Sequence, residues 1–416
     1  MRTEKRSAFL SGLCGVAVAL GMMATSASAL VTTERGASIL AFPKVLADGS
    51  TDTIIQITNI SNNMVHAHCF YVNAAPDLFG NPLWQVTDFT IWLTKQQPTH
   101  WQVSEGRFVN PSDNNACIKG GSYFPSTMCD GAGIDPGAIP PTAEGFTGEL
   151  KCVEVDVAGN PIGGNHLKGE ATLLTLDDDA SKYNAVGIQG TDLAGETGNE
   201  LLLNQPNDAD GGEPVGQYNA CPNVLLLNHL AEGVTDPILY ENGLGGTCSV
   251  GNAPCYSDDD CGSGTCNNPP QVLDSANKVD LRSASITDLT LIPCTQDFEN
   301  SLPSSVTVQF AIYNEFEQRF SASTTVDCWA NFYLFQVDSP LDPERSVFSF
   351  PTLGTVAAHT RITPNPDGGA VIGVAGVTRA NNQGSLTRTA YNIHMEGDRF
   401  SASGGEITDK ITLPDR

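Results

Sequence analysis

Positive charge is scarce in this sequence. Its 416 residues include 21 Lys and Arg against 47 Asp and Glu, so that the net charge at neutral pH is −26. A surface this negative repels phosphate groups, which argues against nucleic acid and anionic lipid as partners. The acidic residues are spread along the chain rather than gathered in one tail, a pattern typical of a solvated surface.

Catalytic signatures are absent as well. The sequence contains no Gly-x-Ser-x-Gly elbow, no His-Glu-x-x-His motif, no phosphate-binding Gly-x-x-x-x-Gly-Lys-Ser/Thr loop and no Cys-x-x-Cys-His haem site. The paired carboxylates of glycoside hydrolases leave no local pattern, so that class of enzyme stays open. We therefore name no catalytic residue, and a non-enzymatic protein is favoured over an enzyme.

Long apolar runs are missing except near the N-terminus. The run at residues 8–24 lies between three basic residues and the small-x-small sequence Ala27-Ser28-Ala29. This order predicts a secretory signal peptide over residues 1–29. The mature chain then has 387 residues, with 18 basic and 46 acidic side chains and a net charge of about −28. Since no later segment is suited to span a bilayer, we expect an extracytoplasmic protein that is secreted, periplasmic or held at the cell surface without an integral membrane segment.

Helical periodicity is nearly absent after the signal. What recurs is two-residue alternation in segments rich in β-branched and aromatic residues, separated by clusters of Gly, Pro, Asn and Asp. Residues 64–72, 89–93 and 306–313 show this alternation most clearly. Short strands at this spacing predict an all-β fold of two antiparallel, immunoglobulin-like sandwiches rather than a parallel sheet with crossover helices.

Composition divides the mature chain into three parts. Residues 30–198 are expected to form the first sandwich, which is interrupted by a long loop at about 110–145. Residues 199–271 are expected to form an acidic, loop-rich insert stapled by disulfides. Alternating strands return in residues 272–416, which are expected to form the second sandwich.

Four cysteines lie within nineteen residues of the insert: Cys248, Cys255, Cys261 and Cys266. So short a segment cannot bury a core, and in an oxidising compartment its cysteines are expected to form disulfides. Pairing Cys248 with Cys261 and Cys255 with Cys266 is one of three connectivities. A structural zinc site is the alternative, although its knuckles normally have shorter gaps. The segment resembles the short Cys-rich repeats in secreted proteins of myxobacteria and related environmental bacteria, which implies an extracytoplasmic surface protein and no particular activity.

The other mature cysteines are also expected to pair. Cys117 and Cys129 are placed to tie the long loop, and Cys294 and Cys328 are further disulfide candidates. Because eleven cysteines remain once the signal is removed, at least one of them is free, intermolecular or bound to another group.

Histidines and aspartates supply the candidate metal ligands. His66 and His68 share one face of an expected strand, and His100 is a third imidazole for an open site, although a polar outer face explains the same residues. Asp208 and Asp210 lie in one of several Asp- and Gly-rich loops suited to calcium, but the loop lacks the EF-hand order. We therefore predict no cofactor, with calcium as the open alternative.

Together these features predict an exported, non-enzymatic protein with a structural or adhesive role in the cell envelope or the extracellular space. Two alternatives remain open: a calcium-dependent or glycan-binding module, and a secreted metal-dependent enzyme built on the three histidines. The partner would be an envelope or extracellular protein, a glycan or a second copy of the chain.

Overall fold

Strands dominate the structure, and its helices are short. The computed structural model describes residues 31–77, 82–107, 136–176, 179–205, 216–232, 246–251, 254–255, 261–267, 285–365, 368–380, 386–397 and 409–415. The helices among them are η5 (Leu334–Val337), η6 (Pro343–Arg345) and α2 (Phe350–Leu353). Among these residues, no helix is long and apolar enough to cross a membrane.

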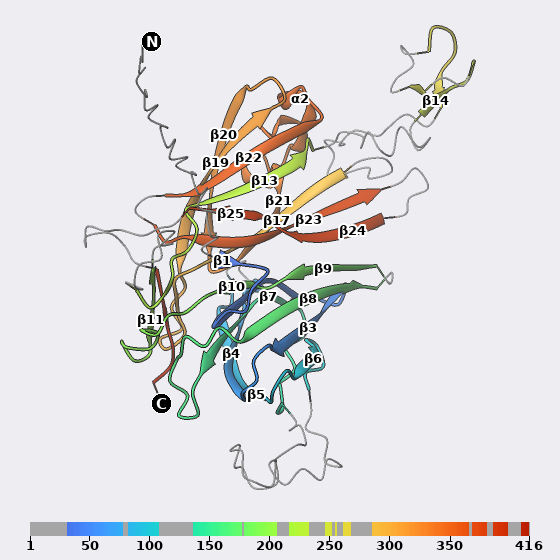
Figure 1. Cartoon of the computed structure of the whole chain (residues 1–416). Coiled ribbons are helices and arrows are strands. Elements are labelled where there is room, and N and C mark those ends of the chain that lie inside the picture. Colours follow the sequence, from blue (N-terminus) through green and yellow to red (C-terminus); the bar gives the residue numbers. More distant parts are fainter. Residues whose placement is uncertain are drawn as a thin grey trace, which may run out of the picture.

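Ten strands form the first sandwich (Figure 1). They are β1 (Val31–Thr32), β2 (Ile39–Ala47), β3 (Thr51–Asn59), β4 (Val65–Asn73), β5 (Gln85–Leu93), β6 (Pro98–Gln102), β7 (Phe146–Val155), β8 (Leu167–Thr175), β9 (Ala180–Asn184) and β10 (Val186–Ile188). One layer has the order β5-β4-β7-β2-β10-β1, and β6-β3-β8-β9 forms the other. The layers join at the hairpin between β2 and β3, which pair at Ala47 and Asp52 alone.

The central pairings of this sandwich are those of an immunoglobulin domain. β3 pairs with β6 and β4 with β7, as strands B–E and C–F do in that fold. The outer strands differ, because β2 pairs mainly with β7 and β8 pairs with β3. All pairings within the sandwich are antiparallel, which confirms the predicted fold class.

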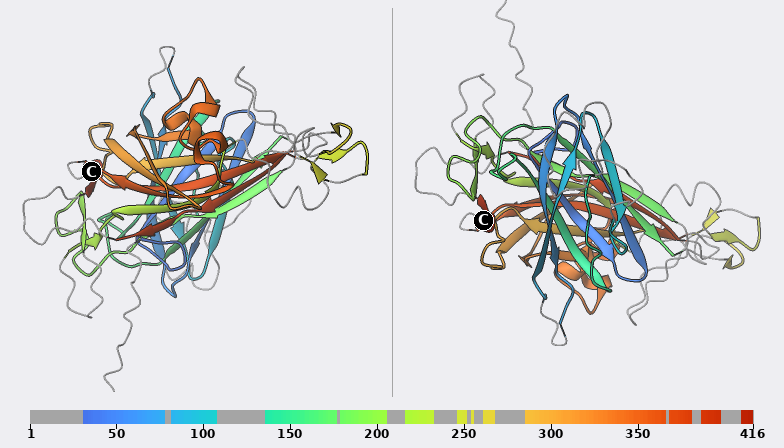
Figure 2. Two further views of the ribbon diagram at one scale, coloured as in Figure 1. Left: turned by 90° about the horizontal axis from the view of Figure 1, so that it is seen from above. Right: turned by 90° about the horizontal axis from the view of Figure 1, so that it is seen from below.

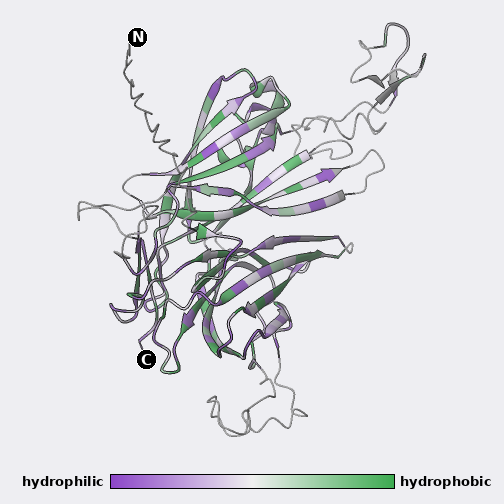
Figure 3. Ribbon diagram, in the orientation of Figure 1, coloured by the Kyte–Doolittle hydropathy of each residue, from purple (hydrophilic) through white to green (hydrophobic). Residues whose placement is uncertain are grey.

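Alternation along the strands produces the core of the first sandwich. Ala67, Cys69 and Tyr71 of β4 point between the layers together with Phe89 and Ile91 of β5. The intervening side chains point to the opposite face of each layer. Figure 3 shows hydrophobic and hydrophilic segments alternating along the strands.

The second sandwich consists of two facing sheets. The five-stranded sheet has the order β20-β19-β22-β13-β25, and the four-stranded sheet has the order β21-β17-β23-β24. Their strands are β13 (Val224–Leu230), β17 (Ser285–Pro293), β19 (Ser305–Asn314), β20 (Arg319–Asp327), β21 (Ala330–Tyr333), β22 (Ala357–Pro364), β23 (Val371–Ala380), β24 (Leu386–Asn392) and β25 (His394–Glu396). The three short helices lie between β21 and β22 and cover one end of this sandwich, where Phe348 packs against Phe310 with ring centroids 5.9 Å apart.

Two small sheets complete the fold. One has the order β12-β11-β26-β18, and the other has the order β15-β14-β16. Their strands are β11 (Glu200–Gln205), β12 (Tyr218–Asn219), β14 (Gly246–Cys248), β15 (Pro254–Cys255), β16 (Cys266–Asn267), β18 (Gln296–Asp297) and β26 (Asp409–Thr412).

A continuous apolar core joins the two sandwiches. Ile39, Phe70 and Val153 on the outer face of β2, β4 and β7 belong to the same buried cluster as Ile292 of the second sandwich and Phe298, which directly follows β18. The rings of Phe70 and Phe298 stack with their centroids 4.4 Å apart. Strands of the two sandwiches cross at a steep angle (Figure 2). Because the second sandwich covers its outer face, β2 is buried along its whole length.

The division of the chain differs from the expected one. β13 lies within the expected insert, yet it pairs with β22 over Leu225–Leu230 and is a central strand of the second sandwich. β11 likewise pairs with β26 near the C-terminus. Among the described residues of the expected insert, only the small β15-β14-β16 sheet matches the compact, Cys-rich unit that we predicted.

Candidate functional site

The histidines predicted as metal ligands do not come together. The ring of His66 stacks on Trp92 with centroids 4.0 Å apart, and Nε2 of His68 lies 2.9 Å from a carboxylate oxygen of Asp88. His100 lies on β6, in the other layer of the sandwich. Among the described residues, no group of three or more His, Cys, Asp or Glu side chains is arranged to hold a metal ion. The predicted three-histidine site was wrong, because His66 and His68 share β4, whereas the strand that carries His100 lies in the other layer.

The predicted calcium ligands Asp208 and Asp210 lie outside the described residues. The same holds for 177–178 and for 258–260, which form the other acidic loops. Calcium binding in these loops stays a prediction.

Three disulfides lie within the described part of the chain. Cys248 pairs with Cys261, as in the connectivity named above. Cys294 pairs with Cys221, and Cys69 pairs with Cys152 across β4 and β7. Cys117 and Cys129 lie outside the described residues, and for Cys255 and Cys266 the backbone alone is described.

Cys328 was predicted as a disulfide candidate, and this prediction was wrong. Its thiol is free and buried next to the interface between the sandwiches. Burial, together with the negative charges of Asp327 and Glu149, raises the pKa of this thiol to about 12. The thiol is therefore protonated at neutral pH and unreactive as a nucleophile.

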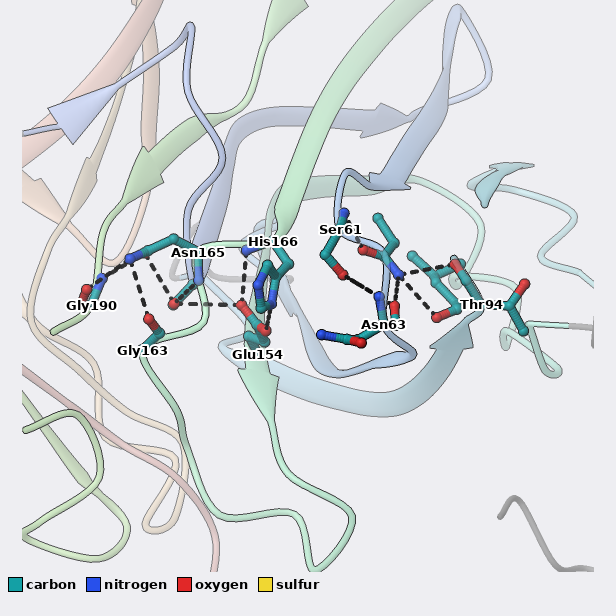
Figure 4. Close-up of polar contacts among 11 residues, drawn as sticks. Ser61, Asn63, Thr94, Glu154, Gly163, Asn165, His166 and Gly190 are labelled. Carbon is teal, nitrogen blue, oxygen red and sulfur yellow. Dashed lines mark hydrogen bonds and ion pairs between the residues drawn. The ribbon is translucent and has the colours of Figure 1, made fainter. Parts of the chain in front are cut away.

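A carboxylate–imidazole pair that we did not predict lies at one end of the first sandwich (Figure 4). Glu154, which is 1% exposed, accepts hydrogen bonds from the backbone N–H of His166 at 3.1 Å and lies 2.7 Å from its Nδ1. Ser38 is also buried, and its hydroxyl bonds to Asn165. The network ties the loop before β8 to the start of β2, so its polar groups are occupied by one another and have a structural role.

A polar groove begins between the two sandwiches and continues over the first sandwich. It consists of two adjoining pockets of about 410 and 500 Å³ that share Ser50, Thr51, Thr175 and Leu176. We call this surface the inter-sandwich groove. In the first pocket, one wall comes from β2, β3 and β8 and the other from β17, β21 and β24, so both sandwiches are needed to form it.

Charged, amide and aromatic side chains line the first pocket of the groove. Lys44 of the first sandwich forms an ion pair with Asp288 of the second. Asn331 accepts a hydrogen bond from the Thr290 hydroxyl at 2.9 Å. Burial and the nearby Asp288 carboxylate raise the pKa of Tyr333, so its phenol is protonated at neutral pH and able both to donate and to accept hydrogen bonds.

The second pocket of the groove is lined by residues of the first sandwich. Asp52 accepts a hydrogen bond from the Gln102 amide at 2.7 Å and one from the Ser104 hydroxyl. Glu144 lies in the same pocket. Together, the two pockets offer hydroxyl, amide and carboxylate groups along a continuous surface, with exposed Leu176 between them.

A separate cavity of about 530 Å³ lies at one end of the second sandwich, between its two sheets. We call it the end cavity. It is lined by Ser285 and Thr287 of β17, by Val377 and Arg379 of β23, and by residues of β13, β19 and β22. On the opposite face of β23, Thr378 lines the inter-sandwich groove, so that this strand separates the two sites.

His229 of the end cavity is held by two hydrogen-bond partners. One ring nitrogen lies 3.0 Å from the carbonyl oxygen of Leu230 and the other 2.8 Å from the hydroxyl of Thr360. Nδ1 therefore donates to the carbonyl, and Nε2 accepts from the hydroxyl. Burial lowers the pKa of His229 to about 4, so the ring is neutral at neutral pH. An imidazole with both nitrogens occupied is not available as a general base.

Acid should destabilise the protein through His229. Its pKa falls from 6.5 to about 4 on folding, so the stability it contributes above pH 6.5 is lost as pH falls toward 4. We expect wild-type protein to lose about 3 kcal/mol more of its free energy of unfolding between pH 7 and pH 4 than His229→Gln does. Urea denaturation at both pH values measures this difference, and equal losses would contradict the assignment.

Comparisons with known proteins identify no family. No protein-family model matches the chain, and no curated protein matches its sequence. Among solved structures, an apo lectin of Pleurotus ostreatus aligns at 12% identity over 93% of this chain and 91% of its own, with a TM-score of 0.13. The same organism's lectin in complex with GalNAc aligns at 11% identity over 88% and 82% of the two chains, with a TM-score of 0.14.

A third solved structure is a virus, Broad Bean Stain Virus, with 10% identity over 95% of this chain and 98% of that chain and a TM-score of 0.14. TM-scores at this level do not establish a shared fold, and no property of the lectins or the virus is transferred to this chain.

Proposed function

We propose that this chain is a non-enzymatic, extracytoplasmic adhesive protein that binds an oligosaccharide in the inter-sandwich groove. The observation that carries the proposal is the groove itself, whose two adjoining pockets of about 410 and 500 Å³ are lined by polar side chains of both sandwiches. Two adjoining pockets suit a chain of sugar units better than a single compact ligand.

The chemistry of the groove matches that of a sugar chain. Sugar hydroxyls both donate and accept hydrogen bonds, and Asn331, Asp52 and Gln102 provide the complementary groups. The C–H faces of sugars are apolar, and Tyr333 and Leu176 provide exposed apolar surface, being 40% and 81% exposed. Because the chain as a whole carries a net charge of −26, a neutral oligosaccharide is favoured over an acidic one.

The contacts between the sandwiches hold the groove in shape. Lys44 and Asp288 bridge its two walls, and the indole N–H of Trp329 donates to the carbonyl of Pro43 at 2.8 Å. Walls fixed before the ligand arrives reduce the entropy that is lost on binding. A stable, rigid binding surface is what an adhesive role requires.

The proposal is tested by binding the purified protein to an array of neutral and acidic oligosaccharides, followed by calorimetry with the best ligand. We expect a neutral oligosaccharide to bind. Tyr333→Ala in the first pocket and Gln102→Ala in the second should each weaken this binding about tenfold, since each removes an apolar contact or a hydrogen bond of about 1–1.5 kcal/mol. Phe316→Ala is the matched control, because Phe316 is 72% exposed and lies outside the groove.

Absence of any bound oligosaccharide at millimolar concentration, or full binding by both groove variants, would overturn the proposal. Repeating the titration with calcium and with a chelator tests the predicted calcium dependence separately. A loss of affinity in chelator would place calcium in the adhesive function, and unchanged affinity would exclude it from the binding step.

A further inference from the structure

The end cavity contains a buried hydroxyl without a partner. Ser285 is 3% exposed, and among the described residues its Oγ finds no hydrogen-bond partner. Ser285 shares a face of β17 with Thr287 and Leu289, which points toward the five-stranded sheet and the cavity. A buried polar group left unpaired lowers stability, so its presence calls for an explanation. A ligand that bonds to this hydroxyl supplies one.

A cation stands next to this hydroxyl. Arg379 is the direct cross-strand partner of Ser285 in the pairing of β17 with β23, so the two side chains leave the sheet on the same face. Both line the cavity. An O–H donor beside a guanidinium is a suitable arrangement for a carboxylate, which takes charge-assisted hydrogen bonds from both.

Deeper in the cavity the lining is apolar or already satisfied. Val377 pairs with Thr287, two residues further along the same strands. Ala358 lies on β22 in the facing sheet, where it pairs with His229. The His229 ring is neutral and its nitrogens are occupied, so it offers no charge to a ligand. Glu315 is the acidic residue of the lining, and its carboxylate faces the backbone N–H of Ala357 at 3.5 Å.

We propose that the end cavity binds an amphipathic carboxylate, such as a medium-chain fatty acid, with the carboxylate on Arg379 and Ser285 and the apolar chain against Val377 and Ala358. The volume of about 530 Å³ falls within the usual range for small-molecule sites, about 300–1,000 Å³. This site is independent of the oligosaccharide proposed for the groove, because β23 lies between them.

The test is calorimetry of the purified full chain with three twelve-carbon probes that differ in the head group: dodecanoate, dodecan-1-ol and dodecyltrimethylammonium. We expect dodecanoate to bind at one site per chain, the alcohol to bind about tenfold more weakly and the cation to give no heat. Arg379→Met keeps an apolar stem at the rim and should weaken dodecanoate about tenfold while leaving the alcohol within about threefold.

Ser285→Ala separates a ligand role from a structural one. Because the hydroxyl has no hydrogen-bond partner among the described residues, its removal should leave the melting temperature unchanged or raise it, and yet weaken dodecanoate binding several-fold. Thr290→Val is the matched control on the same strand, since the Thr290 hydroxyl donates to Asn331 at 2.9 Å and its loss should lower stability without changing dodecanoate binding. Absence of heat from dodecanoate, equal affinity for the cation, or an Arg379→Met protein with wild-type affinity would overturn the proposal.

Discussion

Replacing Lys151 by Met should lower the free energy of unfolding by about 3–5 kcal/mol, because it leaves a buried carboxylate without its counter-charge. Lys151 and Glu149 are completely buried, at 0% exposure each, between the two sandwiches. The Lys151 ammonium lies 3.0 Å from Oε2 of Glu149 and 3.1 Å from the carbonyl of Pro293. Gln296 completes the group by bonding to both side chains.

The pH dependence of this variant identifies the cause. Burial raises the pKa of Glu149, and in wild-type protein the charge of Lys151 opposes that rise. Without Lys151 the folded pKa should rise further, and a raised folded pKa means that stability is present at low pH and is lost as pH rises through that value. Lys151→Met should therefore be closest to wild type near pH 5 and furthest from it near pH 8, as measured by urea denaturation.

A double variant provides the matched control. Glu149→Leu combined with Lys151→Met removes both charges and keeps similar volume, so it should recover most of the stability lost in the single variant. A single variant as stable as wild type at pH 8 would show that the pair is not buried as described. Because Lys151 also contacts Pro293 and Gln296 across the interface, the same variant should loosen the walls of the inter-sandwich groove.

The sandwich class could be predicted from alternation, because each strand of the first sandwich places every second side chain in one core. β4 shows this most clearly, with Ala67, Cys69 and Tyr71 between the layers. Alternation does not predict the position of β2. All nine of its residues, from Ile39 to Ala47, are buried because the second sandwich covers its outer face. A strand buried on both faces has no polar alternation to signal which layer it occupies.

Long-range pairing accounts for the errors in domain division. β13 lies in a stretch rich in Asn, Gly and acidic residues, and its place in the second sandwich follows from pairing with β22, more than a hundred residues later. His66 and His100 were grouped as one site, but His66 lies on β4, which pairs with β5 and β7, whereas His100 lies on β6, which pairs with β3 in the other layer. Such contacts leave no trace in local composition.

The candidate sites could not be predicted from local sequence patterns either. The inter-sandwich groove collects single residues from strands of both sandwiches, and the pairing of Lys44 with Asp288 joins positions 244 residues apart. In the sequence, Lys44, Glu149 and Lys151 look like ordinary surface charges. Their burial results from packing one sandwich on the other, which composition does not encode.

The disulfide between Cys69 and Cys152 is expected to make the second large contribution to stability. Replacing both cysteines by Ala should lower the free energy of unfolding by about 4 kcal/mol, because the bond closes a long loop, 83 residues in sequence separation, and restricts the unfolded chain. Both cysteines are fully buried at 0% exposure in the core of the first sandwich, so reductant should reach the bond only when the protein unfolds.

The variant Cys328→Ala distinguishes the effect of the cross-link on stability from the effect of lost packing. Cys328 is as deeply buried, at 1% exposure, but its thiol is free, so its replacement removes a sulfur atom and no cross-link. We expect a cost of about 1 kcal/mol for this variant. Urea denaturation of the three proteins without reductant measures both effects. Similar losses of unfolding free energy in the two variants would assign the contribution of Cys69 and Cys152 to packing. A difference of about 3 kcal/mol would assign it to the disulfide. That bond joins β4 to β7 and thereby fixes the layer on which the second sandwich packs.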